Sequence, residues 1–242
     1  MLKTIPLRTT SLIVTFFTKD HGKIKGVVKG VRQEREMRNS LYEFFTRVEI
    51  VYYEKLKSDL HLISEASFID TYESIRMRLE PLTYASYFSE LVDETTEVHD
   101  PQPKIFELLD FAYRYLPAIP GEKLSRLFEI KLLREVGWLP YLEACLACET
   151  SQAERYFFSA RQGALVCPSC LHKFADARPI SADVLNVMRY YVKHDMEESL
   201  RQDVSRVTEE ELKILMERFF LERIPKPFKS RLFLEKIKPV LK

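Results

Sequence analysis

The residues best suited to chemistry are the four cysteines of the chain, Cys145, Cys148, Cys167 and Cys170. They form two Cys-x2-Cys pairs that are separated by eighteen residues. This layout is typical of a four-thiolate zinc site. Four sulfur ligands complete a tetrahedral shell at about 2.3 Å and leave no open position for a substrate. The spacing therefore predicts one zinc ion with a structural role.

Other uses of cysteine pairs are two disulfides, a redox-active dithiol and an iron–sulfur cluster. The segment between the two pairs favours zinc, because residues 156–159 and 164–166 have strand character and residues 161–163 form a turn between them. The resulting hairpin would bring the two pairs together. His172 lies two residues after the last cysteine and is interpreted as a bystander, because four cysteines already fill the shell.

The composition indicates a globular chain that can bury a sizeable core. It has 242 residues, of which 46% are apolar, so one large domain or two small ones are expected. The chain has no run of 18 apolar residues, so no membrane span is predicted. Residues 1–6 lack the apolar core of a signal peptide. Because thiolates are available for a metal, we expect a cytoplasmic location.

Charge is distributed unevenly along the chain, although the formal net charge is only +1. Residues 1–38 carry nine basic and three acidic side chains, a balance of +6. Residues 66–120 carry four basic and ten acidic side chains, a balance of −6. Residues 223–242 carry seven basic and one acidic side chain, a balance of +6. This pattern indicates surfaces for different partners, or ordinary variation between solvated faces.

The first seventy residues contain five segments with strand character. They are residues 2–8, 11–18, 23–31, 41–53 and 60–69. Five short strands at this spacing predict a small five-stranded barrel of the OB-fold type in residues 1–78.

The rest of the chain has helical periodicity. Helices are expected after Pro81, after Pro103, around residues 124–136, after an N-cap at Ser181, after a capping box of Thr208 with Glu211, and over residues 229–240. Residues 197–207 are expected to form an exposed loop. The fold class is therefore α+β: an OB-fold domain followed by an all-helical domain, residues 79–242, with the zinc module inserted at residues 141–175.

Basic residues cluster in and around the third predicted strand. Side chains of a strand alternate between two faces, so Lys23, Lys25 and Lys29 are expected to share one face. The full predicted basic set is Lys19, Lys23, Lys25, Lys29, Arg32, Arg35 and Arg38. Such a surface attracts nucleic-acid phosphates without reading the bases. The alternative is a solvated strand face whose lysines protect against edge pairing.

Three features together resemble the RecO family of bacterial DNA repair proteins. Residues 18–32 match the run T-x-x-x-G-K-x-x-x-x-x-K-G-x-R, and residues 128–140 match F-E-x-x-L-L-x-x-x-G-x-x-P. The four cysteines stand where many members have a zinc module. The resemblance extends over the whole chain, in order.

This resemblance implies an N-terminal OB-fold, a helical domain and a zinc site. It implies a non-enzymatic protein, associated with the nucleoid, that binds single- and double-stranded DNA and anneals complementary strands. It also implies that the protein acts with RecR to load RecA on DNA coated by the single-stranded-DNA-binding protein (SSB).

The resemblance further implies that the acidic, apolar C-terminal tail of SSB is a partner. Such a tail requires an apolar pocket rimmed by cations. We expect the rim to consist of Arg126, Lys131 and Arg134, and the apolar pocket to include Leu127 and Phe128. The alternative is that Leu127 and Phe128 are ordinary core residues.

Two other classes of protein also use cysteine-rich zinc sites. The first is a zinc-ribbon factor of transcription or translation, which would bind a polymerase or ribosome. The second is a zinc-dependent nucleotide-processing enzyme such as a deaminase, which requires an open metal position and a glutamate in a His-x-Glu context. The sequence contains no His-x-Glu, so this class is disfavoured.

Overall fold

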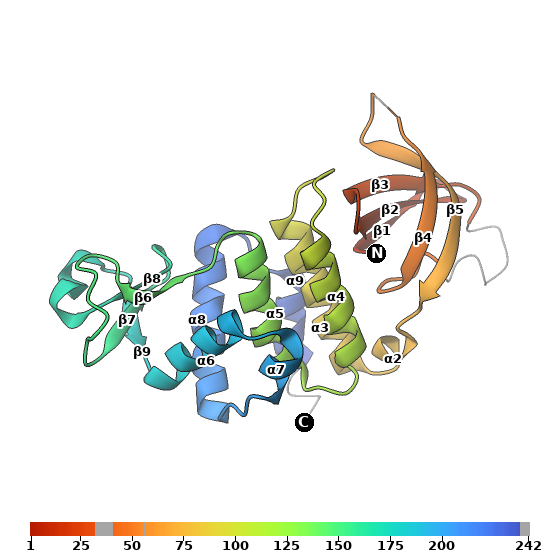
Figure 1. Cartoon of the computed structure of the whole chain (residues 1–242). Coiled ribbons are helices and arrows are strands. Elements are labelled where there is room, and N and C mark those ends of the chain that lie inside the picture. Colours follow the sequence, from red (N-terminus) through yellow and green to blue (C-terminus); the bar gives the residue numbers. More distant parts are fainter. Residues whose placement is uncertain (32–40, 56, 238–242) are drawn as a thin grey trace. The chain divides into compact units, whose positions relative to one another are not determined.

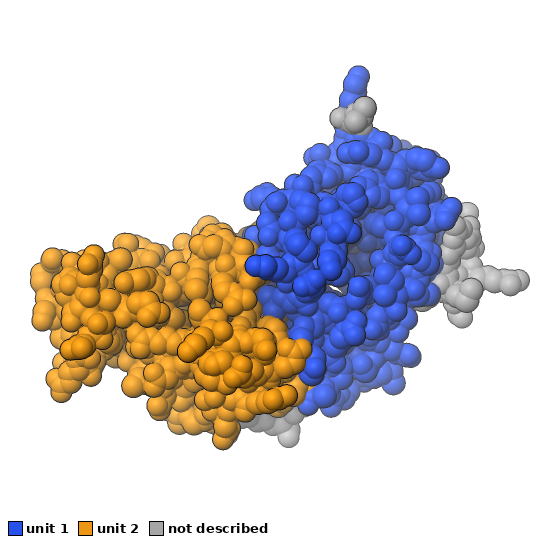
Figure 2. Space-filling model, viewed as in Figure 1, with its two compact units in different colours: residues 1–118, 228–242 blue, residues 119–227 orange. Residues whose placement is uncertain are grey.

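The computed structural model describes residues 1–31, 41–55 and 57–237. A five-stranded sheet is followed by helices and by a second, smaller sheet (Figure 1). The chain forms two compact units (Figure 2): unit 1 joins residues 1–118 with the segment that begins at Phe228, and unit 2 holds residues 119–227. Unit 1 thus contains helices as well as the first sheet, and the expected division near residue 78 stays a prediction.

The first sheet contains β1 (Lys3–Leu7), β2 (Ser11–Thr18), β3 (Gly22–Val28), β4 (Arg47–Tyr53) and β5 (Leu60–Asp70). The strand order is β1-β2-β3-β5-β4, with β3 and β5 parallel and the other neighbours antiparallel. The prediction of five strands is confirmed. The strand expected over residues 41–53 begins only at Arg47, because Phe45 has a φ of 65°, a left-handed conformation that interrupts an extended chain.

The two faces of β2 and β3 have different roles, because successive side chains of a strand point to opposite sides. Val14, Phe16, Ile24 and Val28 lie in one buried apolar cluster together with Ile63 of β5. The space beside Gly26 is filled by the Ile63 side chain, whose Cδ1 would lie 2.3 Å from a Cβ at position 26. The odd-numbered residues, including the lysines, therefore point away from this cluster.

Unit 1 also contains α2 (Glu73–Arg76), α3 (Leu79–Thr95), α4 (Pro103–Tyr115) and α9 (Lys229–Ile237). Helix α4 contacts β2, where the rings of Phe17 and Phe106 lie 6.3 Å apart. Helix α9 packs on α3. The Glu90 carboxylate accepts hydrogen bonds from the backbone N–H groups of Lys229 and Ser230, each at 2.9 Å. A side chain of α3 thus satisfies the open N-terminus of α9.

Unit 2 contains α5 (Gly121–Glu135), α6 (Ala182–Lys193), α7 (Met196–Arg201) and α8 (Arg206–Arg223). Helix α5 contacts all three others, as does α6. Every residue of α5 from Leu124 to Leu133 is buried, polar ones included. Across the described residues, no helix combines the length and the apolar sequence that crossing a bilayer requires.

The caps of these helices agree with the sequence in one case and differ in two. Ser181 caps α6 as predicted, with its Oγ accepting from Val184 N at 3.2 Å. The predicted capping box is wrong: Ser205 caps α8, and Glu211 instead accepts from Ser181 N at 2.7 Å. The loop expected over residues 197–207 is shorter in the structure, because α7, which Asp195 caps, extends to Arg201 and α8 begins at Arg206.

The second sheet belongs to unit 2 and contains β6 (Tyr141–Cys145), β7 (Tyr156–Ser159), β8 (Ala164–Val166) and β9 (Arg178–Ile180). Its order is β6-β8-β7-β9, and the 3-10 helix η1 (Pro168–Lys173) follows β8. The predicted hairpin of β7 and β8 is confirmed. Gly163, with a φ of 65°, provides the left-handed residue that the tight turn requires.

Candidate metal centre and nucleic-acid interface

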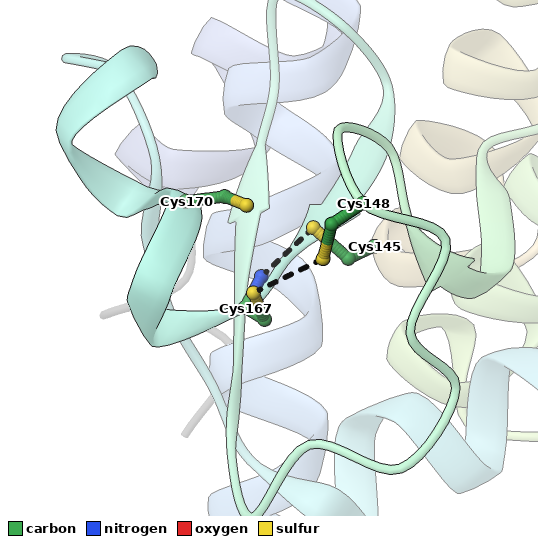
Figure 3. A group of neighbouring side chains, drawn as sticks. All are labelled: Cys145, Cys148, Cys167 and Cys170. Carbon is green, nitrogen blue, oxygen red and sulfur yellow. Dashed lines mark hydrogen bonds between the residues drawn. The ribbon is translucent and has the colours of Figure 1, made fainter.

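The four cysteines converge at one end of the second sheet (Figure 3). Cys145 is the last residue of β6, Cys148 lies in the turn after it, Cys167 follows β8, and Cys170 lies in η1. Their sulfur atoms all lie within 4.8 Å of one another. The prediction that the two Cys-x2-Cys pairs come together is confirmed.

Two similar backbone turns position the sulfurs. Glu149 N donates to Cys145 O at 2.9 Å, and Cys170 N donates to Cys167 O at 3.1 Å. Each turn therefore folds one pair back on itself. Cys167 N also donates to Cys145 Sγ at 3.3 Å, which joins the two pairs and favours a thiolate at Cys145.

The thiols affect the ionisation of one another. Burial raises the pKa of Cys145, but backbone N–H donors, Cys167 first, lower it to about 6. The Cys148 sulfur, followed by burial, raises the pKa of Cys170 to about 12. Four adjacent thiols cannot all ionise unless a cation offsets their mutual repulsion. The cluster is therefore suited to a divalent metal ion.

The geometry fits zinc. A tetrahedral ion with Zn–S bonds of about 2.3 Å holds its sulfurs about 3.8 Å apart, and the Cys148 and Cys167 sulfurs lie 3.7 Å apart. A disulfide requires about 2.05 Å, and all four cysteines are free thiols. Among the described residues, the metal-binding group consists of the four cysteines alone, so His172 lies outside it.

The centre is built into a small core, and Cys148 is its one exposed cysteine. Cys145, Cys167 and Cys170 are buried together with Val166. The side chains of Ala153, Phe157 and Phe174 pack against this group. Four protein ligands complete the shell of a zinc ion, which is the arrangement of structural sites.

The second predicted site lies on the outer face of β3, where the structure exposes Lys25, and Lys29 is exposed directly after the strand. The strand register adds a lysine that sequence reasoning missed: Lys3 pairs with Thr15, and Thr15 pairs with Lys25. Directly opposite residues of antiparallel strands point to the same face, so Lys3 and Lys25 share one. Only the register could identify Lys3, because its own segment is short and mostly apolar.

Apolar residues lie on the same face as these lysines. Ile5 pairs with Ile13, Ile13 with Val27, and Val27 with Leu62. Ile5 is 45% exposed, and the other three are half-buried. We call Lys3, Lys25 and Lys29, together with this apolar row, the outer face. It combines exposed cations with exposed and half-buried apolar side chains.

Lys19 and Lys23 differ from this pattern. Lys23 is only 8% exposed, and its Nζ donates to the backbone and carboxylate of Asp93, the latter at 3.1 Å. The expectation that it shares an exposed face with Lys25 and Lys29 thus differs from the structure, because α3 covers this end of β3. Lys19 is exposed but forms an ion pair with Glu107 at 2.9 Å, which raises its pKa. The predicted residues Arg32, Arg35 and Arg38 lie outside the described residues.

The three cations expected to rim a pocket on α5 are mostly internal. Arg126 is 7% exposed and pairs with Glu129 at 2.8 Å. Lys131 is 3% exposed and donates to the His194 carbonyl. Burial, followed by the nearby Arg134, lowers the pKa of Lys131 to about 8. Only Arg134 is exposed, so the expectation of a three-cation rim differs from the structure.

In the comparison with known proteins, both parts of the chain match the same protein family. Residues 1–72 match the family described as "Recombination protein O N terminal", and residues 76–232 match "Recombination protein O C terminal". The chain is 30% identical to the DNA repair protein RecO of Syntrophus aciditrophicus, over 98% of this chain and 93% of that protein. It is 25% identical to the RecO protein of Bacillus pumilus, over 100% of this chain and 94% of that protein.

Proposed function

Because the chain belongs to the RecO family of DNA repair proteins, we propose that it is a non-enzymatic, DNA-binding mediator of recombination. In this proposal it works in the cytoplasm on the nucleoid, binds single- and double-stranded DNA, and anneals complementary single strands. Together with RecR it helps RecA to load on DNA that SSB covers.

The observation that carries the proposal is the outer face. Lys3, Lys25 and Lys29 surround an apolar row on a sheet surface. Lysines release counterions from phosphates and give affinity with little sequence preference. Apolar strand surface accommodates bases, which a protein that anneals strands of any sequence has to contact.

The strand order supports an OB-fold for the first sheet. The order β1-β2-β3-β5-β4 leaves β1 and β4 as the two edges, which a barrel brings together. The Thr4 hydroxyl on β1 donates to the Tyr42 carbonyl, five residues before β4, at 3.4 Å. This contact brings the two edges near each other and favours a partly open barrel.

We assign one structural zinc ion to the four cysteines. When bound, it would fix β6, β8 and η1 to one another as a cross-link. A closed four-thiolate shell offers no position for an activated water. This arrangement favours the mediator over a zinc-dependent nucleotide-processing enzyme, and the family match favours it over a zinc-ribbon transcription or translation factor.

For the SSB tail we propose a pocket in unit 2 rather than the α5 rim, where Arg134 alone is exposed. The pocket, of about 110 Å³, lies between β7, β9 and α8 and is lined by apolar residues that include Phe158, Pro179 and Ile214. Arg178, Arg218 and Glu211 also line it, and the Glu211 carboxylate accepts a hydrogen bond from Ser181 N. Apolar depth beside two guanidinium groups fits a peptide that ends in an apolar residue and a carboxylate.

The decisive experiment is a charge reversal on the outer face. Lys25→Glu with Lys29→Glu should weaken the binding of all single-stranded oligonucleotides alike. The slope of log affinity against log salt should fall by roughly 0.7 for each phosphate contact that is lost. The measurement is fluorescence anisotropy at several salt concentrations, followed by a strand-annealing assay.

The matched control is Lys193→Glu with Arg201→Glu. It makes the same change in charge at two exposed positions of unit 2 and should leave both readouts nearly unchanged. Equal loss of binding in the two double variants would reduce the effect to net charge and contradict the assignment of the outer face.

A further inference from the structure

A cavity of about 380 Å³ lies within unit 1 between the first sheet and α4. Its walls come from the end of β2 and the turn after it, from β4, and from α4. Pockets for small molecules range from about 300 to 1,000 Å³, so this one has room for a single aromatic group with a polar attachment. Both Phe16 and Phe17 line it at the end of β2, and it is distinct from the outer face because none of the residues of that face lines it.

The cavity walls are largely aromatic. The aromatic residues that line it are Phe16, Phe17, Tyr52, Tyr72, Phe106 and Tyr113. Phe17 of β2 and Phe106 of α4 lie 6.3 Å apart across the contact between sheet and helix. The Arg47 guanidinium lies 5.4 Å from the centre of the Phe106 ring. Flat rings and a flat guanidinium favour a planar ligand that can stack on them.

The charges around the cavity argue against an anion inside it. Lys19 and Arg47 are its two permanent cations, and Asp20, Glu49 and Asp110 are its three carboxylates. Arg47 is already paired with Asp110 at 2.9 Å, and Lys19 is paired with Glu107. A phosphate in the cavity would therefore meet no net positive charge, whereas a neutral ring would not be repelled by the carboxylates.

Two polar atoms in the wall have no hydrogen-bond partner among the residues that the structure describes. They are Thr46 Oγ1 and Arg47 Nε, and both residues line the cavity. A buried polar group without a partner destabilises a protein. Both atoms are shielded from solvent, so a ligand with polar atoms would relieve this cost after a small movement of the cavity wall.

We propose that this cavity takes one unstacked base of a bound single strand, an inference that rests on the proposed function. A nucleobase is planar and neutral, and its edge carries acceptors beside donors. The aromatic side chains of a partner protein fit less well: phenylalanine has no polar atom, and tryptophan has a donor but no acceptor. Tyrosine offers one hydroxyl oxygen, whereas the edge of a base carries several polar atoms. The base would stack near Phe106, while its phosphates stay outside.

The test isolates one base from the phosphates. One probe is a 12-nucleotide strand made entirely of abasic tetrahydrofuran units, and the other is the same strand with a single central thymidine. Both carry the same number of phosphates, so lysine contacts bind them equally. We expect the single thymidine to tighten binding to the unchanged protein by roughly 5- to 100-fold, the range for one stacked base.

Two variants with opposite steric effects should both remove this gain. Phe106→Ala deletes the stacking ring, and Val48→Phe fills the cavity. The matched control is Phe111→Ala, a half-buried phenylalanine of the same helix that stacks on Tyr115 at 4.3 Å and does not line the cavity. It should keep the gain. Circular dichroism and thermal unfolding verify that each variant is folded.

The outcomes separate this inference from the function on which it rests. Equal affinity for the two probes, or a gain that survives Val48→Phe, would overturn the base pocket alone. Failure to bind either probe would overturn the DNA-binding function and the pocket with it. If N-acetyl-tryptophanamide occupies the cavity and the thymidine gives no gain, the cavity takes a protein side chain, and the proposal is wrong.

Discussion

Strand β3 and helix α5 were both expected to present a row of cations, but the two rows differ in their exposure to solvent. Lys25 of β3 and Lys29, the residue after the strand, are exposed to solvent. On α5, Arg126 and Lys131 are buried and bonded to neighbouring groups. A sheet strand with one face on the core keeps its other face for partners. A helix surrounded by three others has no such face, so its cations become part of the interior.

The largest effect is expected from a substitution at the metal centre, which tests whether the folding of unit 2 depends on that centre. Cys148→Ser should abolish stoichiometric zinc binding and unfold residues 141–180, because structural zinc contributes about 10–16 kcal/mol, as much as a whole domain's stability. The helices around α5 should stay folded but become less stable, because Phe219 of α8 packs against Phe158 of β7. Metal analysis, limited proteolysis and circular dichroism measure the three outcomes. His172→Ala is the control and should retain about one zinc ion per chain.

A large effect is also expected from breaking the buried ion pair of α5. Arg126→Ala removes the guanidinium that lies 2.8 Å from the fully buried Glu129. Loss of one member of such a pair costs about 3–5 kcal/mol, measured by urea unfolding. Arg134→Ala, at the exposed end of the same helix, should change stability by less than about 0.5 kcal/mol. A similar loss of unfolding free energy in the two variants would mean that the buried and the exposed cation contribute equally to stability.

A smaller effect should appear in the pH dependence of stability. The pKa of Lys131 is about 8 in the folded protein, against 10.5 for an ordinary lysine in the unfolded chain. Between these values the unfolded chain binds more protons, so the free energy of unfolding contributed by this group rises with pH. The destabilising contribution is fully present below pH 8 and is lost by about pH 10.5, a change of at most about 3 kcal/mol. Lys131→Met should lack this rise in unfolding experiments across that range.

The smallest effects test the comparison within β3 itself. Lys23→Ala removes the buried ammonium that bonds to Asp93 and should cost about 1–3 kcal/mol, the range for hydrogen bonds to charged groups. Lys25→Ala should change stability by less than about 0.5 kcal/mol and yet weaken DNA binding more. The reverse order in thermal unfolding would show that the outer face contributes to the fold rather than to partners.

The sequence alone determined the features that depend on local spacing. Two Cys-x2-Cys pairs around a hairpin predicted a site that the structure assembles from Cys145, Cys148, Cys167 and Cys170. Alternating β-branched residues predicted five strands, and Ser181 before an apolar stripe predicted a helix start. These succeed because hydrogen bonds, turns and side-chain periods act over a few residues.

Tertiary structure alone decided which polar side chains are hidden and what they contact. Lys23 and Lys25 are indistinguishable by strand period, but the end of α3 covers only Lys23. Glu211 has the spacing of a capping box, yet it bonds to Ser181, thirty residues away, and Glu90 caps a helix 139 residues later. Such partners come from elements that meet only after folding. Their burial and pairing depend on packing, which local periodicity does not encode.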